Sequence, residues 1–95
     1  MGKDCAYEVG TNYFIRTKDR MYTGTLQKIY QHELVFVMVS WILDTGPITK
    51  TLITGDFREV DPYPENCQVI ITRESAKEMI KIDFPLPREV KKGIY

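Results

Sequence analysis

The sequence is poor in the side chains that most often build metal sites and disulfide frameworks. It has one histidine, His32, and two cysteines, Cys5 and Cys67, which lack the CxxC spacing of zinc and redox motifs. Two cysteines are too few to staple a small secreted scaffold. We therefore expect no metal or other cofactor, and two free thiols or a single Cys5–Cys67 bridge are the alternatives for this pair.

Catalytic motifs are absent as well. The chain has no glycine-rich phosphate loop, no GxSxG nucleophile turn and no HExxH metal motif. His32 precedes Glu33 in a polar turn, where a solvated loop residue is a simpler interpretation than a general base. An acidic stretch, which an exposed loop explains better than a cation site, comprises Asp56, Glu59, Asp61 and Glu65. We therefore expect a protein without enzymatic activity.

The sequence also lacks a net charge and a long apolar segment. Thirteen basic residues balance thirteen acidic ones, which removes the usual signature of a protein that coats nucleic acid or an anionic membrane. The longest apolar run, residues 34–43, is too short to span a bilayer as a helix. Residues 1–10 lack the apolar core of a secretion signal. We therefore expect a cytoplasmic protein with no membrane partner.

What the sequence does contain is a series of short strand-like segments separated by turns. These segments are rich in β-branched and aromatic residues, and several alternate between apolar and polar positions. Turn residues recur about every eight to twelve positions, which is typical of a small β-barrel or β-sandwich. The expected strands cover residues 12–18, 21–30, 33–44, 48–55, 57–60, 68–73 and 78–84.

A glycine inside the second strand decides between the two all-β architectures. Gly24 marks a sharp bend or a close backbone approach, and this favours a small, strongly bent β-barrel of five to seven strands. One domain covers residues 1–95, with a short arm at 1–10 and an extended tail at 85–95. Residues 75–78 fit a helix capping box, but a hairpin turn is our preferred interpretation there.

The stretch from Ile15 to Val39 has an alternating strand, a polar turn, a glycine inside the second strand and an apolar third strand, and in this it resembles the first motif of the Sm-like (LSm) family. A weaker similarity to the second motif lies in "LITGD" at 52–56. The resemblance implies an SH3-type barrel that assembles through its strand edges into a cyclic homo-oligomer of five to seven subunits and that binds RNA. The matching residues are "FIRTKDR" at 14–20, Gly24, Leu26, Ile29 and "LVFVMV" at 34–39.

The residues with which Sm-like proteins read uridine are replaced in this chain. The family places Asp and Asn around its second turn and Arg in its second motif, whereas Tyr30, Leu34 and Thr54 stand here. In this respect the chain is similar to divergent phage and bacterial members of the family. The expected function is therefore a ring-forming binding or scaffolding module, and the alternative is a phage-type structural or adaptor protein that binds another protein.

Basic and aromatic side chains alternate in the expected first hairpin. This pattern suits phosphate neutralisation combined with base stacking, so it predicts weak contact with RNA or single-stranded DNA. In the alternative interpretation the aromatic rings fill the core and the cations form its solvated side. The candidate nucleic-acid residues are Arg16, Lys18, Arg20, Lys28 and Tyr30.

The apolar run at 34–43 has too few polar residues for a strand with one solvated face. Alternate residues of a strand point to opposite sides, so one set fills the barrel and the other needs a second cover. A neighbouring subunit is the preferred cover, and the N-terminal arm or the C-terminal tail is the alternative. The expected oligomer interface consists of Val35, Val37, Val39 and Trp41.

Overall fold

The computed structural model describes residues 6–92, and these form six strands and one short helix. The strand count agrees with the predicted range of five to seven, and the fold is mainly β. The elements in chain order are β1 (Asn12–Arg16), β2 (Met21–Ile29), β3 (Glu33–Asp44), α1 (Ile48–Thr54), β4 (Glu59–Pro62), β5 (Val69–Thr72) and β6 (Glu78–Lys81).

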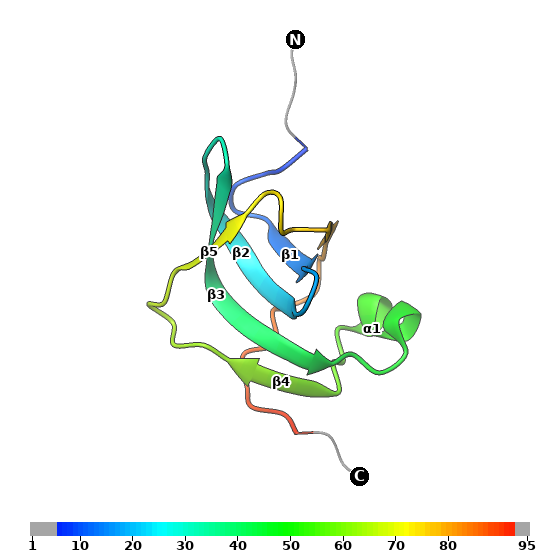
Figure 1. The fold of residues 1–95 in the computed structure, drawn as a ribbon. Helices are drawn as coiled ribbons and strands as arrows, with labels where there is room; N and C mark the ends of the chain where they lie inside the picture. The colour runs from blue at the N-terminus through cyan, green and yellow to red at the C-terminus, as the bar shows by residue number, and fades with distance from the viewer. Residues whose placement is uncertain (1–5, 93–95) are drawn as a thin grey trace.

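All six strands belong to one antiparallel sheet, in which β3 is the longest member. β1, β2 and β3 form a meander, and β6 pairs with the outer side of β1. The two halves of β3 have different outer partners, since residues 33–36 pair with β5 and residues 40–44 pair with β4. In Figure 1 the long β3 arrow passes from β5 to β4 and leads into α1. The change of partner divides β3 into a half that pairs with β5 and a half that pairs with β4.

β5 and β6 follow each other in the chain but lie on different sides of the sheet. A turn at 73–75 separates them, which confirms the turn expected there, but β5 pairs with β3 and β6 pairs with β1. The expectation of a hairpin is therefore wrong. A connection as short as residues 73–77 requires the sheet to curl until its edges approach each other. Among the described residues, however, no ladder joins β5 to β6, so the sheet is not shown closed into the predicted small, strongly bent barrel.

A bulge interrupts the alternation of β3 near its middle. Thr23 pairs with Ser40 and Thr25 with Val37, so β3 has one residue more than β2 between these pairs. Met38 lies in this extra stretch with a φ of 54°, which is uncommon for a residue other than glycine. After the bulge, the residues of β3 whose side chains face the core are shifted by one position in the sequence.

Gly24 faces this bulge across the sheet. A Cβ at Gly24 would lie 3.0 Å from Val39 Cγ2 and 3.3 Å from the carbonyl oxygen of Val37. This confirms the close backbone approach that the glycine predicted, and it explains why a larger residue would displace the middle of β3.

The sheet encloses two neighbouring groups of buried side chains. Because of the bulge, Leu34, Phe36 and Val39 all reach the first group, together with Ile15 and Leu26. The second group lies beside β4 and α1. It consists of Phe14, Ile42, Phe57, Val60 and Ile82, with Leu52 and Phe84 packed against it.

The strand predicted at 48–55 is wrong, because residues 48–54 form α1. Its Ile and Thr residues favour a strand only weakly, and tertiary contacts can override that preference. Pro47 stands before the first turn, where its missing N–H is not needed. Leu52 packs on the second core, and Gly55 ends the helix in the left-handed conformation with a φ of 75°.

The tail at 85–92 folds back along β3 and β4 and carries specific contacts. The Arg88 guanidinium donates to the carbonyl oxygens of Val39 at 2.6 Å and Tyr63 at 2.6 Å. The Ser40 hydroxyl donates to the Pro87 carbonyl at 2.5 Å, and Lys91 exchanges two backbone hydrogen bonds with Val60. The tail therefore covers the outer side of β4, as the red segment beside β4 in Figure 1 shows.

Candidate functional site

Three of the five predicted nucleic-acid residues gather at the turn between β1 and β2. Arg16, Lys18 and Arg20 are all exposed there. Arg16 forms an ion pair with Glu78 at 3.0 Å, and the Arg20 guanidinium lies 4.6 Å from the centre of the Trp41 ring. Two of these cations therefore already have partners within the chain, and the indole face that could stack on a base contacts Arg20.

The other two predicted residues lie far from this turn. Lys28 is at the opposite end of β2, and Tyr30, which is 50% exposed, follows the strand. At about 3.3 Å per strand residue, the length of β2 separates Arg20 from Lys28 by roughly 25 Å. The five residues therefore do not form one site, and contact with nucleic acid stays a prediction.

The four predicted interface residues are more covered within one chain than the sequence indicated. Val35 is 6% exposed and Val39 is 1% exposed, while Val37 and Trp41 are half-buried. Val39 belongs to the core because the bulge turns it inward, and Arg20 covers part of Trp41. The expectation that these side chains form one uncovered face is wrong. Subunit contact itself stays a prediction, because a single chain does not test it.

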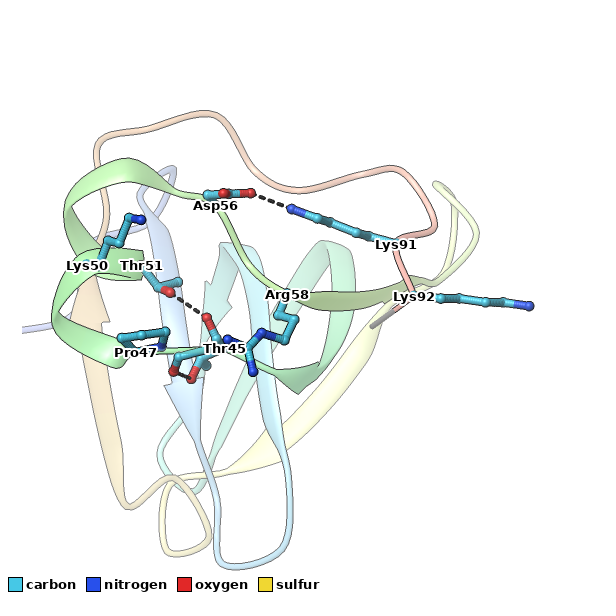
Figure 2. A pocket seen from close by; sticks show the side chains of 9 residues that line it. Thr45, Pro47, Lys50, Thr51, Asp56, Arg58, Lys91 and Lys92 are labelled. Atoms are coloured by element: carbon cyan, nitrogen blue, oxygen red, sulfur yellow. Dashed lines mark hydrogen bonds and ion pairs between the residues drawn. The ribbon is translucent and has the colours of Figure 1, made fainter. Parts of the chain in front are cut away.

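A cavity of about 500 Å³ lies beside α1 and was not expected. Figure 2 shows that its wall combines the turn before α1, the helix, the segment before β4 and the end of the tail. We call this cavity the α1 pocket. Its lining residues are Thr45, Gly46, Pro47, Lys50, Thr51, Asp56, Arg58, Lys91 and Lys92.

Hydrogen bonds of the turn fix the inner wall of the α1 pocket. The buried Thr51 hydroxyl donates to the Thr45 carbonyl and ties the helix to the turn. The Gly46 N–H donates to the Asp44 carboxylate at 2.9 Å, and Gly46 has a φ of 71°. The same Asp44 carboxylate lies 3.7 Å from the Arg58 guanidinium, which places that cation at the pocket wall.

The α1 pocket is strongly cationic. Lys50, Arg58, Lys91 and Lys92 line it against one carboxylate, that of Asp56. Lys91 forms an ion pair and hydrogen bond with Asp56, which lowers the pKa of this carboxyl below its ordinary value of 3.8, and the positive charge of Lys50 adds to the effect. Lys50 and Lys92 have no ion pair within residues 6–92. The pocket is therefore suited to an anion.

No arrangement typical of metal binding or catalysis accompanies the pocket. Among residues 6–92, no three His, Cys, Asp or Glu side chains gather closely enough to hold a metal ion. The acidic residues at 56–65 are therefore not brought together as a cation site. His32 is exposed in the turn between β2 and β3, away from the α1 pocket.

Reasoning from the sequence missed the α1 pocket because its charges come from separated segments. Lys50 was assigned to a strand, Arg58 to a short strand and the two lysines to an extended tail. The adjacent pair Lys91 and Lys92 was the only local signal, and two lysines at a chain end are common on solvated surfaces. Only the folding of the tail onto β4 brings them to α1.

No protein-family model, curated protein or solved structure matches the chain. Within the described part of the chain, α1 is the only helix, and neither it nor any other segment is a helix long and apolar enough to cross a membrane.

Proposed function

We propose that this protein is a non-enzymatic, self-assembling binding or scaffolding module of the Sm-like type. The observation that carries the proposal is a pair of short strands, β5 and β6, each of which has a ladder on one side only. An edge strand presents unpaired backbone N–H and C=O groups, and these are a template for pairing with another chain.

The positions of the two open edges, β5 and β6, favour assembly into a ring. β4 is covered on its outer side by the tail through Val60 and Lys91, so it is not available for pairing. β5 and β6 belong to opposite sides of the sheet and have no such cover among the described residues. Pairing β5 of one copy with β6 of the next is a head-to-tail contact, which closes into a ring when the rotation permits.

An exposed apolar side chain on β5 supports this choice of edge. Ile70 is 62% exposed, whereas its neighbour Ile71 is 6% exposed and packs in the first core. An exposed apolar residue on such an edge strand gains about 1.5–3 kcal/mol when a partner buries it fully. The segment Val69–Thr72 also carries no charged residue that would oppose pairing.

Solution mass tests the proposal. Light scattering after size-exclusion chromatography is expected to give a mass of several subunits for the unmodified chain. Ile70→Lys places a charge at the proposed contact and is expected to lower the mass toward that of one chain. Ile53→Lys is the matched control, because Ile53 is 75% exposed on α1 and away from both edges.

Two outcomes would contradict ring assembly through these edges. A monomeric mass for the unmodified chain at high concentration would exclude self-assembly. An unchanged mass for Ile70→Lys would exclude the β5 edge as the contact. A monomer would favour the alternative function, an adaptor in which an open edge accepts a strand from another protein.

A further inference from the structure

We propose that the α1 pocket is a binding site for a phosphate-bearing ligand. This inference goes beyond the assembly function, and it uses residues that belong to neither β5 nor β6. A cavity of about 500 Å³ lies within the usual size of ligand sites, which is roughly 300–1,000 Å³.

The charges of the pocket are contributed by three segments that the fold brings together. Lys50 comes from α1, Arg58 from the segment before β4, and Lys91 and Lys92 from the tail. Figure 2 shows Lys50 and Lys91 on the two sides of Asp56, and both cations lower the pKa of its carboxyl. The Asp56 carboxylate therefore occupies a position where negative charge is favoured, although it neutralises one cation at most.

The unpaired cations define where a ligand would bind. Lys50 and Lys92 have no ion pair among the described residues, while the Arg58 guanidinium forms an ion pair with the Asp44 carboxylate at 3.7 Å. An anion that enters the pocket can therefore contact Lys50 without displacing a partner. The anion can also accept hydrogen bonds from Arg58, whose planar guanidinium matches the geometry of phosphate oxygens.

The remaining lining favours phosphate over other anionic or aromatic groups. The Thr45 hydroxyl donates to the Gly46 carbonyl at 2.7 Å, and the Thr51 hydroxyl donates to Thr45, so neutral donors are already used. Among the lining residues that the structure describes there is no aromatic ring, so none of them offers base stacking as a source of affinity. Recognition therefore depends on charge, and phosphate concentrates more negative charge than one carboxylate.

Titration with pyrophosphate tests the site in the full chain. Amide chemical shifts are expected to change at the turn, α1 and the tail. Lys50→Glu is expected to weaken pyrophosphate binding about tenfold or more, because it removes a charged contact and adds repulsion. Lys77→Glu makes the same charge change at an exposed position between β5 and β6 that does not line the pocket, and it is expected to leave binding unchanged.

A parallel titration with a single-stranded oligothymidylate distinguishes the source of the phosphate. Tighter binding of the oligonucleotide than of pyrophosphate, lost in Lys50→Glu, would support the site and assign it to a nucleic-acid backbone. Binding of pyrophosphate alone would support it and indicate a small phosphorylated molecule. No shift in the pocket at millimolar pyrophosphate, or equal weakening by Lys77→Glu and Lys50→Glu, would overturn the proposal. The thermal midpoints of both variants verify that they are folded.

Discussion

Arg88 is expected to hold the tail on the sheet, and its replacement is the sharpest test of this part of the fold. Its guanidinium bridges the Val39 carbonyl on β3 and the Tyr63 carbonyl after β4, with both distances at 2.6 Å. It also approaches the Ser40 hydroxyl at 3.4 Å. One side chain thus connects three segments in the region where the partner of β3 changes from β5 to β4.

The size of the effect follows from the two short hydrogen bonds. A hydrogen bond to a charged group contributes about 1.5–3 kcal/mol to stability, and Arg88 is half-buried, so the lower end of this range applies. Arg88→Ala is therefore expected to cost about 3 kcal/mol. For a domain of this size, that loss corresponds to a fall of roughly 12–24 °C in the melting temperature. Arg88→Lys retains the charge but not the planar fork, so it is expected to recover only about half.

Urea unfolding followed by tryptophan fluorescence measures this loss, and Trp41 supplies the probe. Glu89→Ala is the matched control, because Glu89 is the exposed neighbour of Arg88 in the same tail, and it is expected to change stability by less than about 0.5 kcal/mol. A loss below about 0.5 kcal/mol for Arg88→Ala would refute the reasoning, since the tail contacts would then contribute nothing in solution.

Two further predictions concern the surroundings of α1. A Cβ at Gly55, where φ is 75°, would lie 2.7 Å from the Phe84 ring, whereas a Cβ at Gly10, where φ is 88°, would have nothing within 4 Å. In urea unfolding, Gly10→Ala is expected to lose the ~1–2 kcal/mol that a left-handed backbone costs a residue with a side chain, and Gly55→Ala is expected to lose more. Equal losses for the two variants would contradict the clash with Phe84. Asp56 has its pKa lowered below 3.8, chiefly by the hydrogen bond from Lys91, so its stabilising contribution is present above about pH 4 and disappears as the pH falls below that value. Unfolding midpoints measured across this range are expected to fall less steeply for Asp56→Asn than for the unmodified chain, and identical slopes would contradict the pairing.

The strands that the sequence predicted well are those whose pattern is local. β1, β2 and β3 begin at residues 12, 21 and 33, where alternation, β-branched residues and polar turns place them. Gly24 also predicted a close approach correctly, because a Cβ at this position would lie only 3.0 Å from Val39 Cγ2. These features depend on backbone preference and on direct neighbours, which a sequence displays.

The errors have a common physical cause, which is that distant segments decide the outcome. Methionine has no preference that predicts the left-handed backbone of Met38. The bulge in β3 at this residue nevertheless moves Val39 into the core. The helix at 48–54 forms because Leu52 packs on the second core, against the strand preference of its Ile and Thr residues. The α1 pocket depends in the same way on the tail, whose position only the folded chain reveals.

The docking of the tail has a consequence for the order in which the molecule assembles. Arg88 is separated from Val39 by 49 positions and Pro87 from Ser40 by 47. Contacts of such long range require a large loop to close before they stabilise the fold, so we expect them to form late in folding. Weakening the tail should therefore leave the refolding rate nearly unchanged and accelerate unfolding. The tail is therefore expected to prolong the lifetime of the folded sheet without accelerating its formation.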